Sequence, residues 1–107
     1  MTAKKPQDRK PPAPKVKQVP GGREVTLRGV TVTVPDDALD DFEFMDDLRR
    51  LTLEKNAALL TAPLRRLVGD QWKQVMDALR NPDTGRVSVM DGTNFMQELL
   101  EAIAPES

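Results

Sequence analysis

One short stretch of alternating apolar residues precedes a long stretch with helical spacing, and this order most constrains the fold. Between Glu24 and Val34, valines and one leucine alternate with other residues, and the phase changes at Arg28-Gly29. Alternation is typical of a half-buried strand, and a glycine at the phase change favours a tight turn. We therefore expect a β-hairpin here, with a single bulged strand as the alternative. Because a lone hairpin is only marginally stable, it has to pack on helices or pair with another subunit.

Apolar residues recur every three or four positions in much of the remaining chain. Asp36 is a candidate N-cap, so the first helix is expected over about residues 37–51. A second helical stretch is expected over about residues 53–68. Pro63 would restart it as a short helix, and Gly69 would end it.

The last third of the chain predicts two further helical segments. The apolar residues from Trp72 to Leu79 share one helix face, and Ser88 precedes Asp91 in a capping-box spacing. The sequence thus predicts a mainly α fold, a small bundle of about four helices preceded by a short β-hairpin. Trp72 is expected in the core, with an exposed partner anchor as the alternative. The residues expected to share the core are Phe42, Leu48, Leu67, Trp72, Val75, Leu79, Leu99 and Ile103.

Residues 1–23 differ in composition from everything that follows. They hold five prolines and seven basic side chains, but few large aliphatic residues. Such a segment buries too little apolar area to offset the entropy of ordering it. We expect a disordered or polyproline-like basic arm at 1–23 and one folded domain, a hairpin with helices, at 24–107.

The residue types that are missing exclude several kinds of chemistry. The chain has no histidine, cysteine or tyrosine. A thiolate nucleophile, a disulfide, a Cys/His zinc site and an imidazole base are therefore impossible. We expect no enzyme, no catalytic residue, no cofactor and no metal site. The N-terminus lacks the apolar region of a secretory signal, and no run is long and apolar enough to span a bilayer. We therefore expect a cytoplasmic protein without membrane association.

Charge divides the chain into a basic leader and an acidic body. Residues 1–35 carry eight basic and two acidic side chains, and residues 36–107 carry eight basic and fifteen acidic ones. Such a body repels phosphate, and the arm has prolines instead of aromatic residues to stack on bases, so nucleic acid is an unlikely partner. An acidic run opens the body, and it would serve as a docking surface for a basic partner, as a solvated face or, least favoured, as a cation site. Its members are Asp36, Asp37, Asp40, Asp41, Glu43, Asp46 and Asp47.

Three motifs in order resemble the tail assembly chaperones of long-tailed bacteriophages. Residues 40–48 read Asp-Asp-Phe-Glu-Phe-Met-Asp-Asp-Leu, like the acidic and aromatic opening helix of that family, which follows a short hairpin. Residues 64–72 read Leu-Arg-Arg-Leu-Val-Gly-Asp-Gln-Trp, like its step from helix to glycine to aromatic residue. Gly-Arg-Val at 85–87 precedes an amphipathic last helix. The resemblance covers residues 24–104, and the arm is not part of it.

The resemblance implies a function in virion morphogenesis. Such chaperones bind the tape measure protein, keep it soluble and help to recruit tail tube subunits. They act in the host cell cytoplasm, leave as the tube polymerises and are absent from the mature virion. Many also have a longer form made by ribosomal frameshifting.

The expected partner-binding surface lies on the first and last helices. Apolar and acidic residues there would cover the apolar stripes of a helical client and keep the complex soluble. We also expect the chain to form a homo-oligomer. The alternative functions are a nucleic-acid-associated adaptor, or a small helical regulator that uses the basic N-terminal arm. The predicted partner-binding residues are Asp40, Asp41, Phe44, Met45, Asp46, Asp47, Met96 and Leu100.

Overall fold

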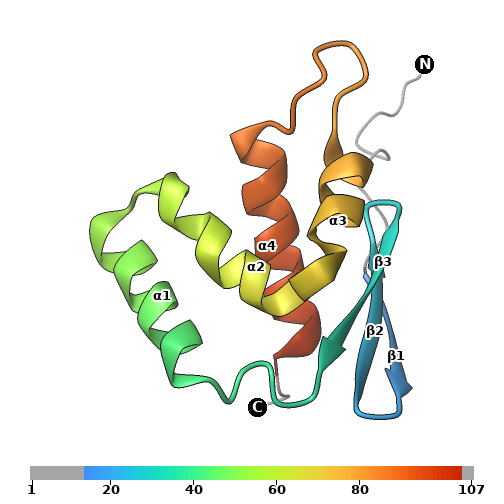
Figure 1. The fold of residues 1–107 in the computed structure, drawn as a ribbon, viewed down its shortest axis with the longest axis vertical. Coiled ribbons are helices and arrows are strands. Elements are labelled where there is room, and N and C mark those ends of the chain that lie inside the picture. The colour runs from blue at the N-terminus through green and yellow to red at the C-terminus, as the bar shows by residue number, and fades with distance from the viewer. Residues whose placement is uncertain (1–13, 105–107) are drawn as a thin grey trace, which may run out of the picture.

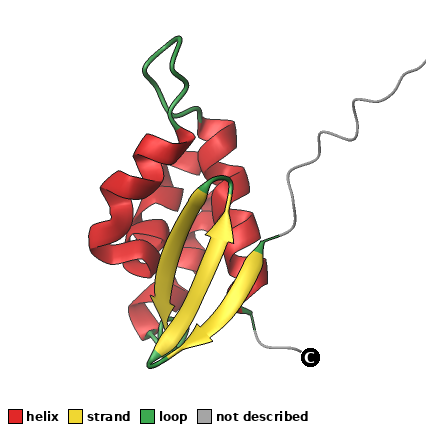
Figure 2. Cartoon of the chain, turned by 90° about the vertical axis from the view of Figure 1, so that its right-hand side faces the viewer, coloured by secondary structure: helices red, strands yellow, loops and turns green. Residues whose placement is uncertain are grey.

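A three-stranded antiparallel sheet forms one side of the molecule in the computed structural model, which describes residues 14–104. The strands follow one another in space as they do in sequence, joined by two tight turns (Figure 1, Figure 2). They are β1 (Lys15–Val19), β2 (Gly22–Leu27) and β3 (Val30–Pro35).

Helices cover one face of this sheet (Figure 2). Figure 1 shows that α4 crosses behind α2 and α3, while α1 lies on the side of the molecule away from the sheet. The helices are α1 (Phe42–Glu54), α2 (Thr61–Val68), α3 (Trp72–Leu79) and α4 (Val89–Ile103), with single 3₁₀ turns η2 (Ala57–Leu60) and η3 (Gly69–Gln71).

The predicted fold class, a bundle of about four helices preceded by a short β-hairpin, is wrong. The chain is a small α/β domain in which the sheet is one wall of the core. Five apolar residues point from β2 and β3 toward the helices, and each is at most 5% exposed. The helices therefore pack on the sheet as well as on one another. The five residues are Val25, Leu27, Val30, Val32 and Val34.

The hairpin itself is present as β2 and β3. Leu27 pairs with Val30 and Val25 with Val32, so the apolar residues of both strands share one face. Arg28 and Gly29 form the turn with φ of 50° and 81°. A turn with positive φ at both central residues matches the twist of the two strands. This backbone conformation is strained for Arg28 but not for Gly29, which has no Cβ.

The arm predicted at 1–23 is ordered from residue 15 onward. Residues 15–19 form β1, and a turn at Pro20-Gly21 leads into β2 at Gly22. Four of the five β1 residues are exposed, so the segment has little apolar burial, as its composition suggests. Backbone pairing to β2 orders it instead. Residues 1–13, where the rest of the predicted arm falls, lie outside the described part of the chain.

The first helix begins five residues later than predicted. Asp41, and not Asp36, is its N-cap: the carboxylate accepts hydrogen bonds from the backbone N–H of Glu43 (2.9 Å) and of Phe44 (3.1 Å). Residues 35–40 form turns instead. The start at Phe42 sets which of the two neighbouring aromatic residues faces the core. Phe44 is fully buried, whereas Phe42 is 92% exposed.

Most of the predicted core residues are buried, but the prediction missed two thirds of the core. Leu67, Val75, Leu79, Leu99 and Ile103 are buried as expected. Leu48 and Trp72 are partly buried against the core. Phe42 is 92% exposed, so its prediction as a core residue is wrong. Besides the sheet residues, the core contains Phe44, Leu64, Val68, Phe95 and Met96.

A bidentate ion pair fastens the β2–β3 turn to α4. Arg28 donates from Nε to Oε1 of Glu98 and from Nη2 to Oε2, both at 2.8 Å. The two side chains are only 22% and 27% exposed. The hydrogen bonds from Arg28 lower the pKa of Glu98, because they favour its charged form.

This ion pair predicts a pH-dependent contribution to stability. Because the pKa of Glu98 is lower in the folded chain, the contribution is present above the unfolded pKa and is lost as pH falls through the folded pKa. Glu98→Gln should cost about 1 kcal/mol at neutral pH and much less at about pH 3. Denaturant unfolding at both pH values measures this difference. Glu54→Gln is the control, since Glu54 lies 3.9 Å from Arg50 on the surface. An equal cost of Glu98→Gln at both pH values would contradict the prediction.

Candidate partner-binding surfaces

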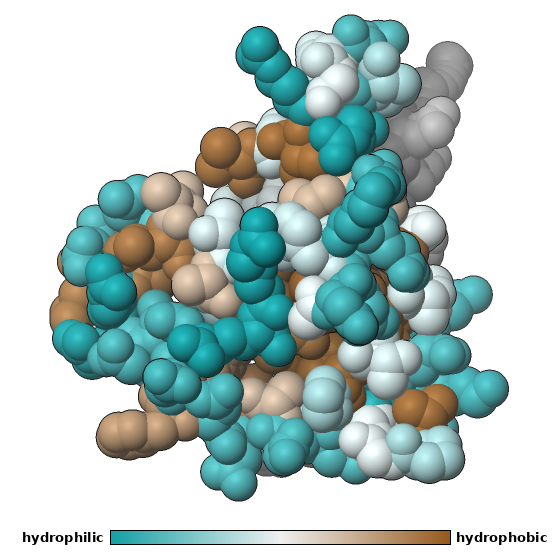
Figure 3. All heavy atoms as spheres, viewed as in Figure 1, coloured by the Kyte–Doolittle hydropathy of each residue, from teal (hydrophilic) through white to brown (hydrophobic). Residues whose placement is uncertain are grey.

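An apolar stripe runs along the outer face of α1. Phe42 is 92% exposed, Met45 43% and Leu53 66%, and their spacing places them on one side of the helix. Apolar side chains gather over α1 in Figure 3, among hydrophilic ones. A shallow recess of about 380 Å³ opens at the start of the stripe. It is lined by Phe42, Glu43, Met45, Asp46 and Arg49.

Several side chains of the acidic run accept hydrogen bonds from the chain itself and are therefore less available to a partner than the sequence indicates. Asp41 is used as the helix cap, and Asp46 accepts two hydrogen bonds from Arg49 at 2.9 and 3.1 Å. Asp47 accepts from Nε of Arg66 in α2 at 2.6 Å, so an arginine remote in sequence balances part of the run. Asp41 and Asp47 therefore hold α1 in place, and Asp46 remains at the edge of the apolar stripe.

The remaining predicted partner-binding residues divide between surface and core. Asp40 and Met45 are exposed, and Leu100 is partly buried. Phe44 and Met96 are 0% and 1% exposed, so neither can contact a partner in this conformation. Their prediction as partner contacts is wrong. The start of α1 at Phe42 directs Phe44 into the core, and α4 buries Met96 in the same core, of which the sheet is one wall.

A second apolar surface, missed in the sequence, is a groove of about 310 Å³ beside the start of α4. Its walls come from η2, α2 and α3, and Figure 3 shows apolar atoms at this position. Val89 on its rim is 69% exposed, and the next residue, Met90, is 71% exposed. Trp72 lines the groove while Arg65 stacks on its ring at 4.0 Å, so the tryptophan is neither fully core nor fully exposed.

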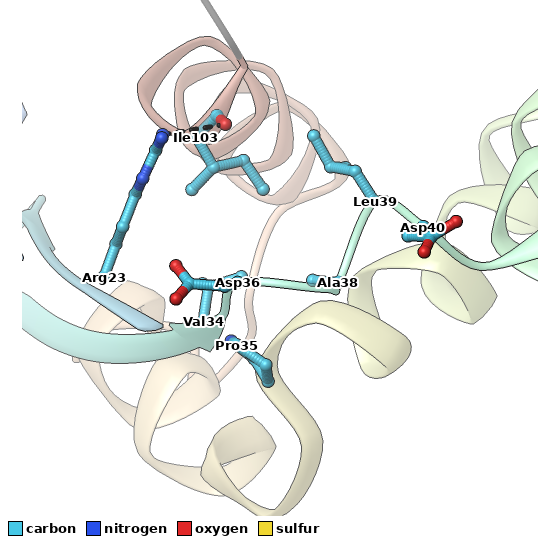
Figure 4. Close-up of a pocket in the computed structure, with 8 residues that line it drawn as sticks. All are labelled: Arg23, Val34, Pro35, Asp36, Ala38, Leu39, Asp40 and Ile103. Carbon is cyan, nitrogen blue, oxygen red and sulfur yellow. Dashed lines mark hydrogen bonds between the residues drawn. The ribbon is translucent and has the colours of Figure 1, made fainter. Parts of the chain in front are cut away.

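A third cavity of about 370 Å³ lies where the sheet, the turns at 35–40 and the end of α4 meet. Figure 4 shows Arg23 reaching from the sheet to Ile103 along one side of the cavity, with Asp36 beside Arg23 and Asp40 on the far side. Nη1 of Arg23 donates to the carbonyl oxygen of Ile103 at 3.0 Å. This bond satisfies a carbonyl at the C-terminus of α4 and places positive charge where the helix dipole favours it. The arginine thus fixes α4 to the sheet.

Between residues 14 and 104, no group of three or more aspartate or glutamate side chains is placed to hold a metal ion. No helix in the same part of the chain combines the length and the hydropathy needed to cross a membrane.

The chain was also compared with known proteins. It matches no protein-family model, no curated protein and no solved structure. The resemblance of the motifs at residues 40–48, 64–72 and 85–87 to tail assembly chaperones therefore stays a prediction from the sequence.

Proposed function

We propose that this chain is a phage tail assembly chaperone that binds the tape measure protein by the outer face of α1. The observation that carries the proposal is the exposed stripe of Phe42, Met45 and Leu53 with acidic side chains beside it. Exposed apolar patches rimmed by polar residues mark interaction sites, and Phe42 belongs to such a patch although Phe44 two residues later is fully buried.

The physical requirements of such a chaperone fit this face. A long helical client has apolar stripes that aggregate until the tail tube surrounds them. A second helix can cover such a stripe through residues at helical spacing. Because the stripe on α1 is short and is interrupted by Arg49, the affinity would be modest, which allows release. The carboxylates of Glu43 and Asp46 would keep the complex soluble and attract basic segments.

The remaining parts of the proposal follow from the same function. The chain would act in the host cell cytoplasm as a binding protein without catalytic activity. It would help to bring tail tube subunits to the tape measure protein and would be absent from the mature virion. Self-association would give several α1 faces along one client.

The test is capture of the tape measure protein of the same phage. That protein should aggregate when made alone and stay soluble when co-expressed with this chain. Phe42→Ser with Met45→Ser should weaken capture at least about tenfold, because each lost apolar contact costs on the order of 1 kcal/mol. The melting temperature should stay nearly unchanged. Affinity is measured by titration, and solubility by centrifugation.

The matched control removes equally exposed apolar residues elsewhere. Val89→Ser with Met90→Ser alters the rim of the groove at α4 and should leave capture intact. If this control loses capture while the α1 variant keeps it, the binding face is wrongly assigned. If the wild-type chain neither retains nor solubilises the tape measure protein, the chaperone proposal itself is wrong.

A further inference from the structure

The two edge strands of the sheet, β1 and β3, differ in the hydrogen bonding of the backbone groups that point away from the sheet. Along β3, Gln71 acts as a substitute strand: its Oε1 accepts from the N–H of Thr33 (2.8 Å) and its Nε2 donates to the Thr33 carbonyl (2.9 Å). Nε2 of Gln74 donates to the carbonyl of Thr31 at 2.9 Å. These glutamines bond three of the four outward backbone groups of Thr31 and Thr33, so little of this edge is available to another strand.

Among the residues that the structure describes, no strand pairs with the outer edge of β1. The first hairpin closes with Val19 paired to Gly22, so alternate residues outward from the turn exchange backbone hydrogen bonds with β2. Val16 and Gln18 lie between those pairs and direct their N–H and C=O groups away from the sheet. Within residues 14–104, no side chain donates to or accepts from these four groups. A strand laid beside β1 would therefore find a row of available hydrogen-bonding groups.

A recess beside this edge would receive the side chains of such a strand. Val16 and Gln18 face the helical side of the sheet, because they pair with Val25 and Arg23, and Val16 is 47% exposed. Figure 2 shows β1 as the outermost strand, with helices behind the sheet. The recess measures about 340 Å³ between β1 and the end of α4. On the α4 side it is lined by Glu101, Ala102 and Ala104.

The charges on β1 argue against a second copy of this chain as the occupant. Two β1 strands that pair antiparallel through Val16 and Gln18 place Lys17 opposite Lys17 of the other copy. Like charges directly opposite one another destabilise a sheet. A shift by two residues in one direction brings Lys15 opposite Lys17 and places Pro14, which has no N–H, opposite Gln18. A shift in the other direction brings Lys17 opposite Val19, but it places Pro20, which also has no N–H and lies in the turn after β1, opposite Val16.

Glu24 lies opposite Lys17 across the β1–β2 pair, whereas Lys15 lies opposite Thr26, and neither lysine forms an ion pair within residues 14–104. The outer edge of β1 therefore keeps a net positive charge on its solvent face and favours a strand of opposite charge.

We propose that the β1 edge binds an extended acidic segment of a partner protein by strand addition. Acidic side chains of the segment lie opposite Lys15 and Lys17 on the solvent face, and small apolar side chains alternate with them over Val16 and the recess. The site goes beyond the function proposed for α1. Figure 1 places α1 and β1 on opposite sides of the molecule, so a helical and an extended partner can be held at the same time.

The experiment uses the full chain and a short synthetic peptide in which glutamate and valine alternate. Binding followed by NMR should slow hydrogen exchange of the Val16 and Gln18 amides and shift resonances of β1 and the end of α4. Lys15→Glu with Lys17→Glu should weaken binding at least about tenfold. The same variant should gain affinity for a peptide of alternating lysine and valine. Gln18→Pro removes one outward N–H without removing a backbone hydrogen bond between β1 and β2, and it should also weaken binding.

The matched control reverses two lysines elsewhere, Lys55→Glu with Lys73→Glu, both exposed. It should bind the acidic peptide as the wild type does. Three results overturn the proposal: unprotected Val16 and Gln18 amides at saturating peptide, equal affinity for acidic and basic peptides, or doubling of the mass without peptide through β1. Each is independent of whether α1 captures a tape measure protein, so failure here leaves the proposed function standing.

Discussion

Phe44→Ala is expected to lower the free energy of unfolding by about 3–5 kcal/mol, whereas Phe42→Ala should change it by less than about 0.5 kcal/mol. The two phenylalanines are separated by one residue on α1, yet their exposed fractions are 0% and 92%. Removing the buried ring leaves a cavity where α1 meets the core, and removing the exposed ring leaves none. Urea denaturation of both variants measures the contrast.

The variants Phe42→Ala and Phe44→Ala also distinguish an effect on partner binding from an effect on the free energy of unfolding. Phe42→Ala should weaken capture of a helical client without affecting unfolding, because its ring has almost no contact with the chain. Equal destabilisation by both variants would show that Phe42 packs inside and that α1 begins earlier than Asp41 indicates. That result would remove the exposed stripe on which the proposed function depends.

Periodicity alone identified β2, β3 and most helices, but it did not identify β1 or the way in which the elements pack. The alternation at 24–34 predicted the hairpin formed by β2 and β3. The third strand was missed because β1 has one partly buried residue and four exposed ones, so it carries no apolar alternation. Its order comes from backbone hydrogen bonds to β2, which leave little signal in the side chains. The sheet's side of the core is formed by β2 and β3, because no residue of β1 belongs to the core.

The first helix shows why element boundaries are hard to infer. Both Asp36 and Asp41 are suitable caps, and apolar residues at three-residue spacing fit either start. The choice depends on tertiary packing, which places Phe44 and Leu48 against the core. The wrong start of the helix also affected the predicted binding surface: Phe44 was predicted to contact the partner and Phe42 to lie in the core, and the structure shows the reverse burial.

The candidate surfaces were only partly visible in the sequence for a related reason. Met45 and Asp46 were predicted as contacts and lie at the outer face of α1. The sequence does not show that Asp47 has a basic partner, because Arg66, which donates a hydrogen bond to it, lies nineteen positions away in α2. Likewise, no local pattern shows that Gln71 closes the β3 edge, since it lies 38 positions from Thr33.

The largest effect expected within the sheet comes from adding a single methyl group at Gly22. A Cβ there would lie 2.5 Å from the carbonyl oxygen of Val34 and 3.3 Å from the Cα of Pro35. Real Cβ atoms do not approach a backbone oxygen so closely, so one strand has to move. Strand β2 cannot yield easily, since it is paired to β1 on one side and to β3 on the other. Gly22→Ala should therefore destabilise the chain by about 1–3 kcal/mol.

Gly92→Ala adds the same methyl group in α4 and should have the opposite effect. No heavy atom lies within 4 Å of a Cβ built there, and alanine restricts the unfolded chain more than glycine does. The free energy of unfolding should rise by about 0.5–1 kcal/mol. Opposite shifts of the urea midpoint for the two variants would support the register in which Gly22 opposes Pro35. If Gly22→Ala were neutral, β2 and β3 would have to diverge at this end, and Arg23 could no longer reach the carbonyl of Ile103 from a fixed strand.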